Sequence, residues 1–149
     1  MKNYHIIILD HVFRGRMTGK SNDIARLIYG AKFFNSETCF NRLVKICCND
    51  IDARDFDAIV PVNTRDSHFS LPQRMCREIA VKLKLKYLDV LYEKNKYAEN
   101  DVKNLKVLVF DDVIYTGATM RKSVNSCIKA GAKSVKFFAI CHSKKFNPA

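Results

Sequence analysis

Residues 106 to 141 restrict the fold most, because a strand, a turn, a helix and a second strand follow one another directly. The continuous apolar run from Lys106 to Phe110 predicts a fully buried strand. A glycine-containing turn follows it, and a helix is expected from about Thr119 to Ala130, with Gly131 as its C-terminal cap. Ser134 to Cys141 predicts the second strand. Such a unit indicates two parallel strands joined by a crossover helix.

The rest of the chain shows the same alternation of strands and helices. Three further apolar runs predict strands, and three further segments carry apolar residues at helical spacing. The strands are expected at Tyr4–Leu9, Asp57–Val62 and Tyr87–Leu91, and the helices are expected after the capping residues Ser21 or Asn22, Ser36 and Ser70. This pattern predicts an α/β fold with a doubly wound, mostly parallel five-stranded sheet.

The size of the chain, 149 residues, fits a single domain over 1–149. We expect residues 1–50 or so to form a small N-terminal cap and residues 51–149 to form the core. No apolar run approaches the roughly 20 residues that span a bilayer. The N-terminus has no long apolar segment followed by a cleavage site, as a signal peptide would. We therefore expect a cytoplasmic protein without a membrane segment.

Charge and cysteine content restrict the function less strongly. The net charge is +11, and no acidic residue follows Asp112. A basic surface attracts nucleic acid, but it attracts a small polyphosphate equally well. The sequence lacks the aromatic-interleaved basic tract of single-strand binders, so it supports nucleic acid only weakly. The six cysteines form no C-x-x-C pair, and we interpret them as reduced side chains that are mostly buried.

The turn after the buried strand carries the residues best suited to chemistry. With the strand ending at Phe110, Asp111 and Asp112 are expected to emerge at its tip, and Thr116–Thr119 turn directly into a helix. Backbone N–H groups and the positive end of a helix suit a phosphate group, which Gly117 allows to approach closely. The two carboxylates accept hydrogen bonds from vicinal hydroxyl groups. A sugar phosphate has a phosphate group for the helix start and hydroxyl groups for the two carboxylates. The alternative interpretation is that this turn is an ordinary helix start without a ligand.

The segment Val107 to Thr119 resembles the signature that binds phosphoribosyl pyrophosphate (PRPP) in type I phosphoribosyltransferases. The chain also resembles the ComF-type members of that family in two other segments, Ile24–Lys32 and Ile59–Val62 with the later Gln73-Arg74. The resemblance touches most of the chain, but only the signature is strongly specific.

The resemblance implies a role for each matching residue. Asp111 and Asp112 would hold the ribose hydroxyl groups, with Mg²⁺ nearby, and would serve as the catalytic and metal-binding pair. The 5-phosphate would be held by Tyr115, Thr116, Gly117, Ala118 and Thr119. The pyrophosphate would face the loop of Val62, Asn63, Thr64 and Arg65, where the family implies a strained or cis peptide.

The chain also departs from the family pattern. Tyr115 stands where enzymes for 6-oxopurines resemble one another in having an aspartate, which disfavours an oxopurine acceptor. The pyrophosphate loop has no glycine. Residues 91 to 105, where a catalytic lid would lie, form a short segment without the usual pattern of the family. The zinc module found at the N-terminus of many ComF proteins has no counterpart here.

These observations predict an Mg²⁺-dependent phosphoribosyltransferase that uses PRPP, releases pyrophosphate and acts on an unidentified acceptor, expected to be a nitrogenous base. Two alternatives stay open. One is a non-catalytic regulator that senses PRPP or a nucleotide, and the other is a ComF-like protein associated with DNA uptake. A homodimer is expected by analogy with the family.

Overall fold

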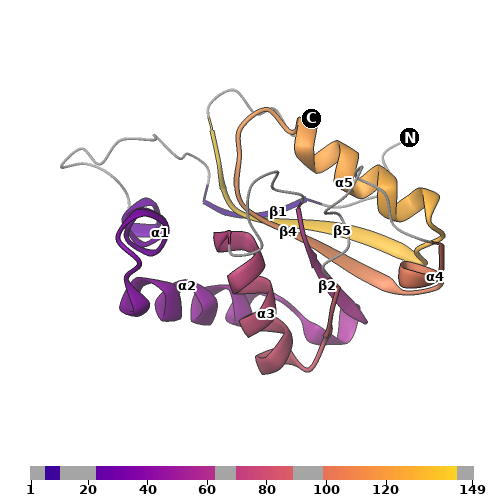
Figure 1. The fold of residues 1–149 in the computed structure, drawn as a ribbon, viewed down its shortest axis with the longest axis horizontal. Helices are drawn as coiled ribbons and strands as arrows, with labels where there is room; N and C mark the ends of the chain where they lie inside the picture. Colours follow the sequence, from indigo (N-terminus) through magenta and orange to yellow (C-terminus); the bar gives the residue numbers. More distant parts are fainter. Residues whose placement is uncertain (1–5, 11–22, 63–69, 89–98, 144–149) are drawn as a thin grey trace.

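The computed structural model describes residues 6–10, 23–62, 70–88 and 99–143, and their arrangement is shown in Figure 1. Five strands form one sheet in the order β1, β5, β4, β2 and β3. They are β1 (Ile6–Asp10), β2 (Ala58–Pro61), β3 (Lys86–Tyr87), β4 (Lys106–Ile114) and β5 (Ser134–His142). All pairs of neighbouring strands are parallel. The predicted α/β, doubly wound, five-stranded sheet is therefore confirmed.

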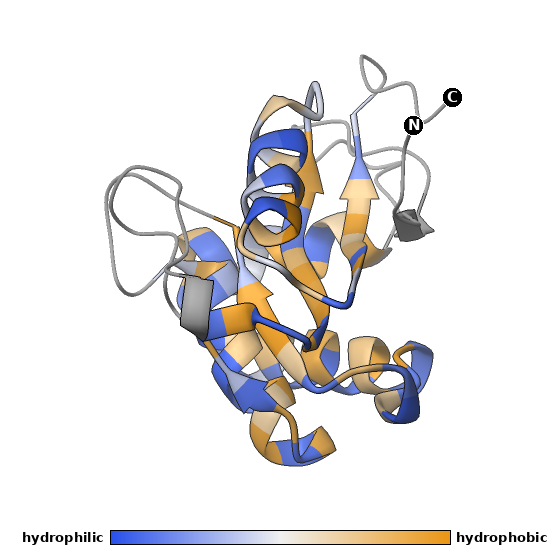
Figure 2. Ribbon diagram, turned by 90° about the vertical axis from the view of Figure 1, so that its right-hand side faces the viewer, coloured by the Kyte–Doolittle hydropathy of each residue, from blue (hydrophilic) through white to orange (hydrophobic). Residues whose placement is uncertain are grey.

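Helices cover both faces of this sheet (Figure 1). One face carries α1 (Asp23–Phe33), α2 (Glu37–Asp50) and α3 (Leu71–Leu83), and a short 3-10 turn (Ala53–Asp55) leads from α2 towards β2. The other face carries α5 (Ala118–Lys129) and the short α4 (Glu99–Val102). Because both faces are covered, the strands are apolar on both sides, as the continuous hydrophobic runs predicted. Figure 2 shows this hydrophobic interior beneath helices whose outer faces are hydrophilic.

The core has two parts, one on each face of the sheet. Along β5 the side chains alternate: Phe137 belongs to the cluster under α5, and Phe138 belongs to the cluster under α1, α2 and α3. Phe138 stacks on Phe110 of β4, with 5.6 Å between the ring centroids. All six cysteines are free, and four of them are buried. Within the described residues, no helix is long and apolar enough to cross a membrane.

The helix boundaries follow the predicted capping residues. Ser36 Oγ accepts a hydrogen bond from Cys39 N at 3.2 Å, at the start of α2. Ser70 and Gln73 form a capping box at the start of α3, in which each side chain accepts from the other residue's backbone N–H. Gly131 follows α5 with φ 90°, as expected of a glycine just beyond a helix.

Three details differ from the sequence expectations. The predicted strand Tyr87–Leu91 is the short β3 in the structure, and its expected end at Leu91 lies outside the described residues. Residues 91 to 105, where a catalytic lid was expected, contain the short helix α4. Strand β1 is an edge strand of the sheet, so only α1 and α2 are left, among the described residues, to form the predicted N-terminal cap. The division into cap and core otherwise stays a prediction.

Candidate functional site

Strand β4 extends further than predicted, and this extension builds the site. The expectation that the strand ends at Phe110 was wrong, because β4 continues to Ile114. Its partner β5 continues beside it, pairing Asp111 with Ala139 and Val113 with Cys141. On the other side, β2 ends at Pro61, opposite Phe110. The acidic pair therefore lies inside β4, at the point where one neighbouring strand has stopped and the other continues.

This point is also where the order of the strands reverses. The chain passes from β2 outwards to β3 and then returns to β4 on the opposite side of β2. In open parallel sheets, ligands bind at the carboxyl ends of the strands beside such a reversal. Val62, directly after β2, and Asp111 and Asp112 of β4 lie on the two sides of this crevice and line one cavity.

Hydrogen bonds to the backbone hold the two carboxylates. Asp111 Oδ1 accepts from Asp112 N, and Asp112 Oδ1 accepts from Val113 N, both at 2.8 Å. The Asp112 residue is 5% exposed, whereas Asp111 is only partly buried. Burial, together with the charge of Asp112, raises the pKa of Asp111 well above its usual value. Hydroxyl donors or a cation in the cavity would stabilise the ionised form of this carboxyl group.

The turn from β4 into α5 forms the second wall of the cavity. Gly117 adopts φ 87°, a left-handed conformation, and α5 begins at Ala118. Gly117 has no side chain to cap the helix, and among the first-turn amides Ala118 N donates to Thr116 Oγ1 at 3.4 Å. Ser143 Oγ donates to Tyr115 O at 2.6 Å, and Arg121 Nη1 donates to Thr116 O at 3.4 Å. These bonds hold the loop at two of its carbonyl groups.

The cavity measures about 220 Å³ and joins most of the predicted site residues. Its lining includes Asp111, Asp112, Tyr115, Thr116, Gly117, Ala118, Thr119 and Val62. The other predicted pyrophosphate-loop residues, Asn63, Thr64 and Arg65, lie outside the described residues, as does the expected strained peptide. Most of the predicted lid, residues 91 to 105, also lies outside them.

Tyr115 lines the cavity, and 55% of its surface is exposed. Partial burial raises the pKa of its phenol above the usual value, an effect that nearby Lys32 opposes. The phenol therefore stays protonated at neutral pH. This agrees with the interpretation that Tyr115 is a poor substitute for the aspartate of the enzymes for 6-oxopurines.

One charged residue of the cavity was missed by the sequence analysis. Lys32, in the last turn of α1, places Nζ 3.5 Å from Asp112 Oδ2. Lysine is common in the last turn of a helix because it interacts favourably with the helix dipole, so its position gave no signal of function. Its partner is 80 residues away in the sequence, and only the folded structure brings the two together.

The side chains of the cavity determine how the site could bind a metal ion. Among the described residues, no group of three or more histidine, cysteine, aspartate or glutamate side chains is arranged to hold one. Asp111 and Asp112 supply carboxylate oxygens, which Mg²⁺ prefers. Mg²⁺ often binds through one or two carboxylates, with water and substrate phosphates completing its shell. The pair fits Mg²⁺ in that mode, in which a phosphate-bearing ligand supplies further oxygens.

A family model and similar solved structures both relate this chain to phosphoribosyltransferases. Residues 41–146 match the family described as the phosphoribosyl transferase domain. Two similar solved structures are a purine phosphoribosyltransferase from Pyrococcus horikoshii OT3 and the APRTase from Giardia lamblia in complex with 9-deazaadenine. The first is 17% identical, with a TM-score of 0.54, over 74% of this chain and 87% of that one. The second is 13% identical, with a TM-score of 0.58, over 75% of this chain and 83% of that one. At these identities the likeness concerns the fold. The search of curated proteins found no match.

Proposed function

Because the chain belongs to the phosphoribosyl transferase domain family, we propose that it transfers a phosphoribosyl group from PRPP to a nitrogenous base, with Mg²⁺ as cofactor and release of pyrophosphate. One observation carries this proposal. An acidic pair and a helix start that its glycine leaves uncapped line the same cavity, beside the reversal of strand order. Ribose hydroxyl groups and a phosphate group are the chemical partners of these two walls.

The two walls have different tasks in binding. The first-turn amides of α5 donate to the 5-phosphate, and Gly117 keeps the approach free of a side chain. Thr116 and Thr119 add hydroxyl donors beside the same group. Asp111 and Asp112 accept hydrogen bonds from the ribose hydroxyl groups. Such a ligand is held at both ends, which fixes the orientation of its anomeric carbon relative to the acceptor.

In the reaction, the bond between the anomeric carbon and the pyrophosphate oxygen breaks, and pyrophosphate leaves with the electron pair. A bond from the acceptor nitrogen to the same carbon forms, and the nitrogen loses its proton to solvent. The ribosyl centre is cationic in the transition state, as in glycosyl transfer generally. The negative potential of Asp111 and Asp112 stabilises that charge from fixed positions. Mg²⁺, when bound, neutralises charge on the departing pyrophosphate.

Pyrophosphate release distinguishes this proposal from a regulatory role. The purified chain is incubated with PRPP and MgCl₂, and pyrophosphate is measured across a panel of purine, pyrimidine and pyridine bases. We expect release above the rate without protein for at least one base, and loss of that release in Asp112→Asn. PRPP binding without release for any base would instead favour the alternative of a PRPP-sensing protein.

A further inference from the structure

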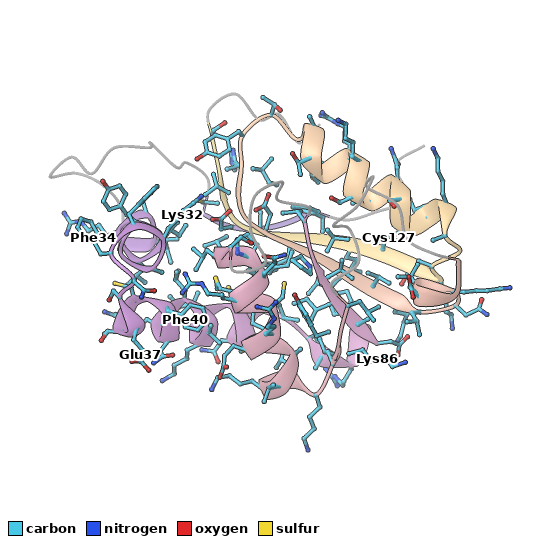
Figure 3. The ribbon with its side chains drawn as sticks, viewed as in Figure 1. Lys32, Phe34, Glu37, Phe40, Lys86 and Cys127 are labelled. Carbon is cyan, nitrogen blue, oxygen red and sulfur yellow. The ribbon has the colours of Figure 1, made fainter. Side chains whose placement is uncertain are left out.

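Lys32 reaches the cavity from a part of the chain that the family match does not include. The match begins at residue 41, whereas α1 ends at Phe33. Figure 3 shows Lys32 on the side of α1 that faces the sheet, with Phe34 on the opposite side. Lys32 lines the same cavity as the acidic pair and the loop before α5. The fold therefore brings a basic side chain from outside the matched residues into this cavity.

The end of α1 is firmly attached to the rest of the molecule. Arg74 of α3 donates from Nη2 to Ala31 O at 3.1 Å and from Nη1 to Asn35 Oδ1 at 3.4 Å. Ala31 and Ile28 are buried in the core beneath the helix. Lys32 thus extends from a fixed backbone position, and only its own side chain has to move to contact a ligand.

The ion pair between Lys32 and Asp112 contributes little to the fold. Its atoms are 3.5 Å apart, and the Lys32 side chain is 41% exposed. Partly exposed lysine–carboxylate pairs contribute little to stability. Asp112 also has a second partner, because its Oδ1 accepts from Val113 N. The ammonium group has three donors and can exchange this carboxylate for an anionic group of a ligand.

We propose that Lys32 binds the acceptor and selects an acceptor that presents an anionic oxygen. This inference rests on the proposed function. When ribose hydroxyl groups donate to Asp112, they take over the oxygen that Lys32 contacts in the structure. Of the described residues that line the cavity, Lys32 is the one with a basic side chain. A carboxylate or similar anion on the acceptor restores a charge partner to it, whereas a neutral acceptor does not.

The test compares acceptor probes that differ in a carboxylate. The full chain is saturated with ribose 5-phosphate and MgCl₂, and the binding of nicotinate against nicotinamide, and of orotate against uracil, is measured by calorimetry. Lys32→Met removes the cation and Lys32→Arg keeps it. Arg26→Met is the matched control, because Arg26 is exposed on the same helix. The affinity for ribose 5-phosphate is measured first in every variant and shows that the site is folded.

We expect the carboxylate to bind more tightly than its neutral partner in at least one pair, by about 10- to 100-fold. Lys32→Met should abolish this preference, and Lys32→Arg and Arg26→Met should keep it. An absent preference, an unchanged preference in Lys32→Met, or no binding of any probe would overturn the inference while leaving the proposed function standing. A failure of ribose 5-phosphate to bind the wild-type chain would overturn this inference, and the pyrophosphate-release assay with PRPP then decides separately whether the proposed function stands.

Discussion

Gly117 connects β4 to α5 with φ 87°, a conformation that residues with a side chain rarely adopt. Gly131, just beyond the other end of α5, has φ 90°. Both glycines therefore adopt a left-handed backbone conformation, but of the two only Gly117 lines the cavity. Comparing them separates the contribution of a glycine to the fold from its contribution to binding a phosphate.

We expect Gly117→Ala and Gly131→Ala each to lower the free energy of unfolding by about 1 kcal/mol, because alanine in a left-handed conformation is strained. A Cβ at Gly131 would meet Lys103 at ordinary contact distances, so strain in φ is its main cost. Only Gly117→Ala should also weaken ribose 5-phosphate binding, since its methyl group would lie where the 5-phosphate is proposed to bind. Urea denaturation and calorimetry measure the two effects. Equal affinity for ribose 5-phosphate in both variants would contradict the assigned role of Gly117.

Asp111 makes the stability of the fold depend on pH. Its pKa in the folded chain lies above the value in the unfolded chain, mainly through burial and the charge of Asp112. The folded state therefore holds the proton more tightly. The tighter proton binding stabilises the folded chain at pH values below the pKa of the unfolded chain. This stabilisation is lost as the pH rises through the pKa of the folded chain. At neutral pH, where the unfolded chain ionises this carboxyl group and the folded chain does so only at a cost, Asp111→Asn should raise the free energy of unfolding by about 0.5–2 kcal/mol.

Urea titrations of Asp111→Asn and the wild-type chain between pH 4 and pH 8 measure this difference. It should grow with pH, and the variant should lose affinity for ribose 5-phosphate in spite of its greater stability. An asparagine variant that is less stable than the wild type at neutral pH would show that Asp111 serves the fold and not the ligand.

Among the elements, the helices were predicted best, because their boundaries depend on local residues. Ser36 and Ser70 cap α2 and α3 as expected, and Gly131 follows α5. The end of β4 was predicted wrongly, because a strand continues as long as a neighbour supplies backbone partners. The sequence of β4 holds no information about the length of β5, with which it pairs as far as Ile114. The acidic pair, which was expected to follow the strand, therefore lies within β4.

Helices α1 and α2 pack closely where Gly30 faces Cys39. A Cβ placed on Gly30 would lie 2.6 Å from Cys39 Sγ and 3.3 Å from Cys39 Cβ. We expect Gly30→Ala to lower the free energy of unfolding by about 1–3 kcal/mol through overpacking. Cys39→Ala in the same chain removes the sulfur and should restore part of the loss. Denaturant midpoints of the single and double variants measure the coupling, and strict additivity would argue against this close contact.

At the scale of the whole molecule, the fold class could be predicted from the alternation of apolar runs and helical segments. The position of the site at the reversal between β2 and β4 follows from the same topology. Pairs that are distant in the sequence could not be predicted, and the contact between Lys32 and Asp112 in the cavity is one example. A single sequence contains the types of these residues but not their proximity, which depends on how α1 packs against the sheet.

We propose that this cavity holds the phosphoribosyl group of PRPP. A calorimetric titration of PRPP into the wild-type chain in the presence of MgCl₂ tests it most directly, with Gly117→Ala and Gly131→Ala titrated in parallel. We predict saturable binding to the wild type and to Gly131→Ala, and clearly weaker binding to Gly117→Ala. The absence of a binding signal with the wild type at millimolar PRPP would contradict the claim.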